Sequence, residues 1–339
     1  MKSSIRIIIA ISCLSYLGLC SCKKESNSSS AGPASETLLN HLQNNYAFSL
    51  FNYALKKTGL DQQMGKDPLT ILVPDNDAFA RDSVLSTADL DKMDTAYLRK
   101  WMAYHILPGT ILVGAVPQTA NTPYPTISGG TLYFSRPVPG NYQIQKDFDH
   151  ILHINGDTVN SPDITASDGV IQVLNRPLKY PDTTIQGYLL AHAQYSELVT
   201  CLQHFGLWDQ LAGPGPFTVF APENSSFVDV RVSPDSLNRL DTVRFQTILF
   251  GIYIVRQARI FLTDFNDIGA ATINNQGGYI TPDGVSYYWY NGALTDAGYD
   301  PVSSQPIPAA YWTSADNITT NGVVHGMHGV LKTPGQAKK

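Results

Sequence analysis

One short pattern occurs twice in this chain and constrains its fold more than any other feature. The first copy runs from Thr70 to Phe79 (TILVPDNDAF), and the second runs from Thr218 to Phe227 (TVFAPENSSF). Each copy is a β-branched and apolar run that ends at a proline. This predicts a buried strand, because proline has no N–H to donate to a neighbouring strand. The polar residues after the proline suit a helix N-terminus, and the phenylalanine is expected to fold back as a hydrophobic anchor.

The two halves of the chain repeat other segments in the same order. Residues 49–60 match residues 196–207, and the run 168–172 (DGVIQ) matches the run 321–325 (NGVVH). Asp-Gly or Asn-Gly before an apolar run predicts a tight turn followed by a strand. The repeat restarts directly after 177–181, so we predict two domains of one fold, over residues 37–180 and 181–335.

The N-terminus is typical of a targeting segment rather than of a folded element. Lys2 and Arg6 precede an apolar stretch from Ile7 to Leu19 of signal-peptide length. The run that follows, Leu19-Cys20-Ser21-Cys22, resembles the bacterial lipobox, which implies cleavage before Cys22 and lipid attachment to its thiol. We therefore expect a signal peptide over 1–22 and a flexible Ser-rich tether over 23–36. An ordinary secretory signal is the alternative, and Cys20 is the weaker candidate for the lipid.

Charge and cysteine content exclude several classes of protein. The formal net charge is −5 and no long basic block is present, which argues against nucleic-acid binding. With Cys22 used by lipid, Cys201 is the one cysteine left after the signal segment, so neither an intramolecular disulfide nor a cysteine-based metal site is expected.

Three motifs together resemble the fasciclin-like domain. They are the strand ending in Pro74 followed by Ala-Phe, the turn Tyr104–Gly109 (YHILPG), and the closing strand Asn321–His325. The resemblance covers nearly all of the chain after the tether. It implies an α+β fold, with each domain a curved β-sandwich wedge carrying helices at one side. It also implies extracellular adhesion or matrix and surface binding without catalysis or a cofactor. The residues that carry this structural signature are Pro74, Phe79, His105, Pro222, Phe227, Gly322 and His325.

Each domain departs from the family pattern in one motif. Gln172 stands in the first domain where the closing strand usually has histidine, and Gly251-Ile252 replaces Tyr104-His105 in the second domain. Each domain has thus lost a different one of the two motifs. This pattern is typical of residues with a structural role, and it argues against any ligand site that needs both motifs in one domain.

Histidine and cysteine residues in these motifs are predicted to serve the fold. His105 has no nearby nucleophile or orienting acid. His325 and His328 lie on a predicted strand, where residues three apart point to opposite faces, so we predict no metal site. Cys201 is expected to be buried and inert. The sequence has no Gly-x-Ser-x-Gly elbow, P-loop, dinucleotide glycine fingerprint or zinc-protease helix, and we predict that the protein is not an enzyme.

An aromatic-rich segment of the second domain is the candidate ligand site. It includes Tyr287, Trp289 and Trp312 among Gly, Asn, Asp and Pro residues. Exposed rings beside amide and carboxylate groups suit sugars or peptide backbones. The alternative is a hairpin whose alternate aromatic side chains fill the core.

Taken together, these patterns predict a lipid-anchored adhesion protein that resembles envelope lipoproteins of Bacteroidota. We expect an outer-membrane address, membrane attachment through the N-terminal lipid, and an extracellular protein or glycan as the ligand. Two functional alternatives stay open: capture of glycans or peptides for an outer-membrane nutrient-uptake system and, less favoured, an envelope hydrolase with a carboxylate pair.

Overall fold

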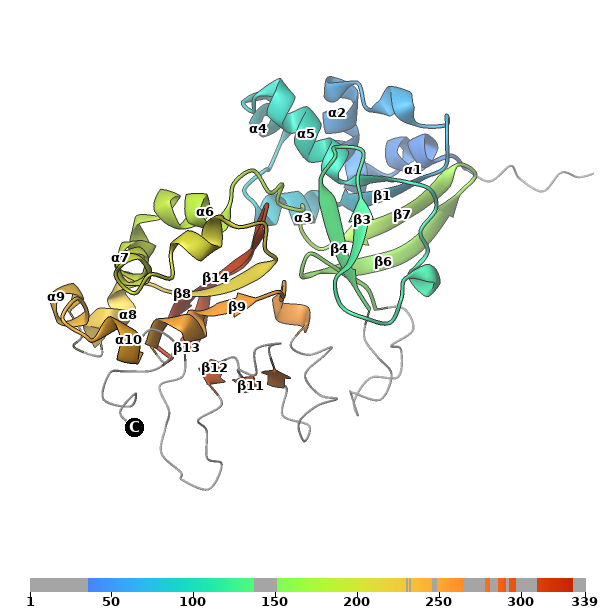
Figure 1. Ribbon diagram of the computed structural model, residues 1–339. Helices are drawn as coiled ribbons and strands as arrows, with labels where there is room; N and C mark the ends of the chain where they lie inside the picture. Colours follow the sequence, from blue (N-terminus) through green and yellow to red (C-terminus); the bar gives the residue numbers. More distant parts are fainter. Residues whose placement is uncertain are drawn as a thin grey trace, which may run out of the picture. The chain divides into compact units, whose positions relative to one another are not determined.

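A computed structural model describes residues 36–136, 151–229, 231, 233–245, 249–264, 278–280, 286–290, 293–296 and 310–331. Side chains are not described at 234, 244–245, 278–280, 286–290 and 293–296. The described residues belong to one compact unit of the chain (Figure 1). Within them, no helix combines the length and the apolar character needed to cross a bilayer.

The first domain places helices before and after its first strand and ends in a run of strands. Its elements are α1 (Leu38–Asn44), η1 (Tyr46–Phe48), α2 (Ser49–Thr58), η2 (Asp61–Gln63), β1 (Leu69–Pro74), α3 (Asn76–Arg81), α4 (Thr87–Asp91), α5 (Thr95–Tyr104), β2 (Ile106–Pro108), η3 (Val113–Ala115), β3 (Thr122–Pro125), β4 (Thr131–Ser135), β5 (His153–Ile154), β6 (Asp157–Ala166) and β7 (Gly169–Leu174). The described strands follow the order β2-β1-β7-β6-β5-β4-β3. β1 pairs in parallel with β7, and the other neighbours are antiparallel.

The second domain repeats this plan. Its elements are α6 (Ile185–Ala191), η5 (Ala193–Tyr195), α7 (Ser196–His204), η6 (Asp209–Ala212), β8 (Phe217–Pro222), α8 (Asn224–Asp229), α9 (Pro234–Leu237), α10 (Thr242–Phe245), η8 (Gly251–Tyr253), β9 (Ile254–Arg256), β10 (Gly278–Ile280), β11 (Ser286–Tyr290), β12 (Ala293–Asp296), β13 (Ala310–Thr319) and β14 (Gly322–His328). The described strand order is β10-β11-β12-β13-β14-β8-β9, with β8 parallel to β14. Both domains mix helices with sheets in a sandwich-like arrangement, which confirms the predicted α+β class.

The duplicated stretch forms the central strand of each domain. Every residue of β1 is buried, because its two faces lie in different cores. Ile71 and Val73 pack with the helices α1, α2 and α5, whereas Leu72 packs with β4, β5 and β7. A strand buried on both faces needs a continuous apolar run rather than an alternating one, which explains the repeated sequence.

The residues after each proline act as the sequence predicts. β1 ends at Pro74, and the Asp75 carboxylate accepts a hydrogen bond from the Ala78 N–H at 2.7 Å, capping α3. Phe79 is fully buried in the helical core. In the second copy β8 ends at Pro222, and Phe227 of α8 is buried in the corresponding core.

A close approach of two strands requires glycine at the start of each closing strand. A Cβ atom at Gly322 would lie 2.2 Å from the Phe217 carbonyl oxygen, and one at Gly169 would lie 2.0 Å from that of Leu69. These distances are far inside van der Waals contact, so the parallel pairs β8–β14 and β1–β7 depend on the missing side chains.

Candidate functional site

His105 is an internal hydrogen-bonding group of the first domain. Its Nδ1 donates to the Trp101 carbonyl at 2.9 Å, and its Nε2 accepts from the Leu178 N–H at 2.9 Å. The ring is fully buried, and burial lowers its pKa to about 4. A neutral imidazole with both nitrogens used ties α5 to the segment after β7, so His105 is unavailable for proton transfer or metal binding.

His325 has a similar position in the core of the second domain. Its Nε2 donates to the Ile260 carbonyl at 2.8 Å, and its Nδ1 accepts from the Asp316 N–H at 3.2 Å. Burial lowers its pKa to about 4 as well. The side chain therefore connects a bulge of β13 with the segment that follows β9.

Gln172 makes the same two connections in the first domain. Its Oε1 accepts from the Asp163 N–H at 2.9 Å, and its Nε2 donates to the Ile111 carbonyl at 3.1 Å. Asp163 and Asp316 correspond by position, and both adopt positive φ at the bulge. The glutamine that departs from the family pattern thus retains the function of the histidine.

The remaining histidine and cysteine candidates are also held by local contacts. His328 lies 2.9 Å from the Asp229 carboxylate and 3.3 Å from the Ser225 hydroxyl, while His325 is turned into the core. Among the described residues, no group of three or more His, Cys, Asp or Glu side chains is placed to hold a metal ion. Cys201 is buried, and burial raises the pKa of its thiol to about 12, so the thiolate needed for nucleophilic chemistry is scarce.

Trp312 belongs in part to the core of the second domain. Its ring lies 5.8 Å from that of Phe220 and 5.3 Å from that of His325, centre to centre. It is half-buried, whereas the adjacent Tyr311 is 55% exposed. Tyr287 and Trp289 lie on β11, but their side chains are outside the described residues, as is Cys22. The predicted aromatic ligand site and the lipid attachment stay predictions.

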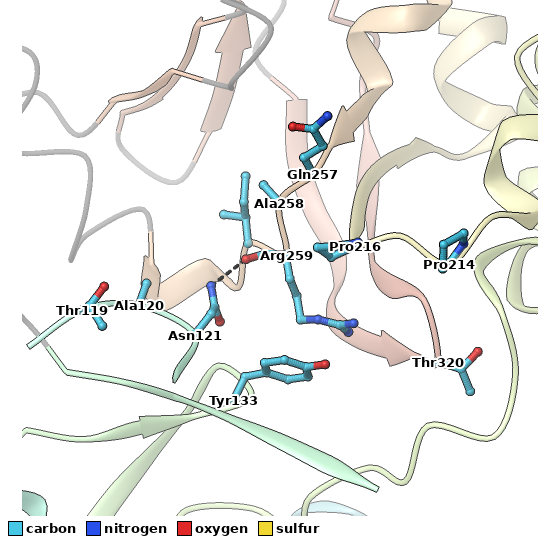
Figure 2. Close-up of a pocket in the computed structure, with 11 residues that line it drawn as sticks. Thr119, Ala120, Asn121, Tyr133, Pro214, Pro216, Gln257, Ala258, Arg259 and Thr320 are labelled. Carbon is cyan, nitrogen blue, oxygen red and sulfur yellow. Dashed lines mark hydrogen bonds between the residues drawn. The ribbon is translucent and has the colours of Figure 1, made fainter. Parts of the chain in front are cut away.

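The described residues of both domains line a cleft at the domain junction. Its volume is about 640 Å³, within the range of ligand-binding pockets. Domain 1 contributes Asn121 at the start of β3 and Tyr133 of β4, and domain 2 contributes the loops before β8 and after β9 (Figure 2).

A polar cluster joins the domains on one side of this cleft. The Asn121 side-chain amide, in a residue with φ 58°, donates to the Arg259 carbonyl at 2.6 Å and to the Asp264 carboxylate at 2.9 Å. The other Asp264 oxygen accepts from the Ser135 hydroxyl at 2.7 Å. Asp264 is fully buried, and burial raises its pKa to about 6. The Asp264 carboxyl group is hydrogen-bonded to both domains and therefore helps to hold them together.

Arg259 forms another wall of the cleft. Its side chain is 8% exposed, and its guanidinium lies 4.2 Å above the Tyr133 ring of domain 1. Nη1 donates to the carbonyl oxygens of Gly322 at 2.8 Å and of Thr319 at 3.3 Å. Figure 2 shows this side chain extending toward Tyr133 and Thr320, between the lining residues of both domains.

Sequence reasoning missed this cleft because nothing in the sequence links its parts. Asn121 and Arg259 are 138 residues apart and belong to no repeated motif. The arrangement offers hydrogen bonds and a buried cation.

The fold is that of a tandem α+β protein with a cleft at the domain junction. A model of the Fasciclin domain matches residues 46–181 and 193–334. These two stretches make up most of the chain, and the protein therefore belongs to the fasciclin family, with two domains in tandem. The predicted tandem fasciclin organisation is confirmed.

Similar proteins come from both animals and bacteria. Human periostin is 30% identical over 196 residues, which cover 55% of this chain and 21% of periostin. Protein sll1483 of Synechocystis sp. is 29% identical over 161 residues, covering 45% of this chain and 79% of that protein. Human stabilin-1 is 29% identical over 166 residues, covering 45% of this chain and 5% of stabilin-1. The chain thus spans about a fifth of the length of periostin.

One similar solved structure is the FAS1 domain pair from the insect cell adhesion molecule Fasciclin I. It is 17% identical, covers 87% of this chain and 100% of its own, and aligns with a TM-score of 0.40.

Proposed function

We propose that this protein is a non-catalytic adhesion protein that binds a partner through its paired fasciclin domains. The observation that carries this proposal is that the histidine and cysteine side chains of the repeated motifs stabilise the fold. His105 and His325 are buried with both ring nitrogens hydrogen-bonded, and Cys201 is a buried thiol. The described residues form a cleft at the domain junction, which supports the proposed binding role.

Membership of the fasciclin family supports the same conclusion, because adhesion and surface binding are the roles that the family resemblance implies. We further propose that a lipid on Cys22 anchors the protein, that the Ser-rich segment 23–36 holds the domains away from the bilayer, and that the site of attachment is the outer membrane. The lipobox-like run before Cys22 supports this part of the proposal.

Adhesion is tested with purified full-length protein coated on a surface. Cells of the source organism and surfaces carrying extracellular proteins are allowed to attach in the presence and absence of soluble competitor protein. We expect attachment that the soluble protein inhibits. Attachment no greater than on a surface coated with albumin would contradict the adhesion proposal.

The anchor is tested separately in the source organism. Metabolic labelling with a fatty acid is expected to mark the wild-type protein and to fail for Cys22→Ser, which should move from the membrane fraction to the soluble fraction. Cys20→Ser is the matched control and should remain labelled. Equal labelling of the Cys22→Ser variant would exclude Cys22 as the attachment site.

The cleft favours a second candidate function, the capture of a peptide or glycan. Its volume of about 640 Å³ and its mixture of polar and apolar walls suit part of a polymeric ligand. Soluble protein that binds a short ligand without supporting attachment of cells is the result that distinguishes capture from adhesion.

A further inference from the structure

The Arg259 guanidinium in the interdomain cleft carries a charge that no described carboxylate neutralises. Among the described residues, Arg259 takes part in no ion pair. The ionisable groups that act on it are the phenols of Tyr133 and Tyr104, and the Tyr133 side chain also hydrogen-bonds to it. Asp264 lies nearby, but its oxygens accept from Ser135, Asn121 and Phe261 instead. A buried cation without an anion is costly, so this position favours an anionic ligand.

The hydrogen bonds of Arg259 leave its Nε–H for that ligand. Nη1 is used by the carbonyl oxygens of Thr319 and Gly322, and Nε has no partner among the described residues. Arginine binds carboxylates through pairs of parallel N–H donors. An incoming carboxylate would satisfy the buried Nε–H and neutralise the charge.

Asn121 supplies a complementary acceptor in the same cleft. Its amide nitrogen donates to the Arg259 carbonyl and to Asp264, which fixes the amide orientation. Its Oδ1 is buried and has no partner among the described residues. This oxygen requires a donor, so the ligand must present an N–H or O–H close to its carboxylate.

The other walls of the cleft favour a peptide. Pro214, Pro216, Ala258 and Ile260 line it with apolar surface, which suits aliphatic parts of an extended chain. A peptide has carboxylates at acidic side chains or at its C-terminus and a backbone N–H at every residue except proline. A peptide segment thus combines the three features that the cleft requires.

We propose that the interdomain cleft binds an acidic peptide segment of a partner protein, with Arg259 holding a carboxylate and Asn121 accepting a peptide N–H. This inference rests on the proposed binding function and names the ligand class. It also makes binding dependent on both domains, because Asn121 comes from domain 1 and Arg259 from domain 2.

The test measures binding of the full chain to synthetic peptides by fluorescence anisotropy. The probes are labelled decapeptides with Asp or Glu at varied positions and a free C-terminus, each matched by a version with Asn or Gln and an amidated C-terminus. We expect wild type to bind members of the acidic set and to bind their neutral versions at least tenfold more weakly. Equal affinity for the two sets would overturn the proposal.

Two variants and a control locate the site. Arg259→Met is expected to weaken binding at least tenfold. Arg256→Met is the matched control, because Arg256 lies three residues earlier, lines no part of the cleft, and donates to Gln210 at 2.8 Å. Thr320→Trp, at an exposed position on the rim, should block the cleft and weaken binding while Arg259 stays in place. Unchanged affinity in both cleft variants, with their thermal unfolding intact, would overturn the proposal.

Two further outcomes separate this inference from the proposals that it rests on. Wild type that supports cell attachment but binds none of the acidic peptides would overturn the cleft assignment and leave the adhesion proposal standing. Wild type that neither supports attachment nor binds any peptide would overturn both. Binding of uronic-acid oligosaccharides in place of acidic peptides, lost in Arg259→Met, would overturn the peptide assignment in favour of a glycan.

Discussion

At the scale of single residues, two different side chains make the same connection in the two domains. Gln172 links the Asp163 N–H to the Ile111 carbonyl, and His325 links the Asp316 N–H to the Ile260 carbonyl. Each side chain provides one acceptor and one donor on the same face of the closing strand. The chemistry required at this position is therefore a donor and an acceptor at a fixed spacing, not an imidazole.

This equivalence predicts that His325→Gln is tolerated and that His325→Leu is not. Leucine would leave the Asp316 N–H and the Ile260 carbonyl without partners, and each buried unsatisfied group costs about 1–3 kcal/mol. We expect His325→Leu to lower the free energy of unfolding by about 2–4 kcal/mol and His325→Gln to lower it by less than about 1.5 kcal/mol. Urea unfolding followed by tryptophan fluorescence measures both, and equal losses would contradict the equivalence.

The same substitution predicts a change in acid stability. The pKa of His325 is about 4 in the folded state, below its ordinary value of 6.5, because burial opposes the charge. The unfolded state therefore binds a proton first as the pH falls below 6.5, and the contribution of His325 to stability is lost progressively toward pH 4. Relative to His325→Gln, wild type should lose up to about 3 kcal/mol over this range. A pH-independent difference between the two proteins would count against a neutral buried imidazole.

At the scale of elements, the parallel pairs β1–β7 and β8–β14 organise both domains. Each pair is formed by strands about 100 residues apart in the sequence, and each depends on a glycine at the start of the closing strand. The central strands are buried on both faces, so a displacement of either pair disturbs two cores at once.

Gly169→Ala is predicted to destabilise the first domain strongly. The added Cβ would lie 2.0 Å from the Leu69 carbonyl oxygen, and the residue has φ 153°. Gly109→Ala is the control, since its φ is also positive but no atom lies within 4 Å of the added Cβ. We expect a loss above about 3 kcal/mol for Gly169→Ala and about 1 kcal/mol for Gly109→Ala. Similar melting temperatures for the two variants would show that the close contact between β1 and β7 does not determine the loss of stability.

At the scale of the molecule, hydrogen bonds between polar groups hold the two domains together. Asp264 accepts hydrogen bonds from Asn121 and Ser135 of domain 1, and Lys179 donates to Asn317 of domain 2 at 3.2 Å. Because this carboxyl group is buried at the domain junction, its protonation is coupled to the packing of the two domains. The proton linkage of Asp264 is opposite in sign to that of His325.

Domain coupling is predicted to weaken as the pH rises toward 6. The folded-state pKa of Asp264 is about 6, above its ordinary value of 3.8, because burial disfavours the carboxylate. The stabilisation from its protonated form is complete below pH 3.8 and is lost as the pH rises through 6, a difference of about 3 kcal/mol. Calorimetry from pH 4 to 7 should show a steeper loss in wild type than in Asp264→Asn, because burial also raises the pKa of Asp157 to about 6 and that of Asp316 to about 7 in both proteins. The same slope in both proteins would assign the dependence to another group.

Much of the fold could be predicted from the sequence, because local chemistry encodes it. Pro74 and Pro222 end strands by lacking an N–H, the run between Thr70 and Val73 is apolar throughout, and the repeat places each element twice. These features act over a few residues, so they are visible without a structure. The sequence pattern indicates a lost motif at Gln172. Its equivalence to His325 becomes visible only when the hydrogen-bond partners of both side chains are known.

The sequence by itself thus determined two fasciclin domains, their order and the strands at their centres. The interdomain cleft was decided by the tertiary structure alone. Asn121, Tyr133, Arg259 and Asp264 come from segments that the repeat does not mark, and their hydrogen bonds and ring contact form only when the two domains are packed together. A site made of contacts between residues more than 100 positions apart leaves no local pattern of spacing or hydrophobicity, which is why only the packed structure shows it.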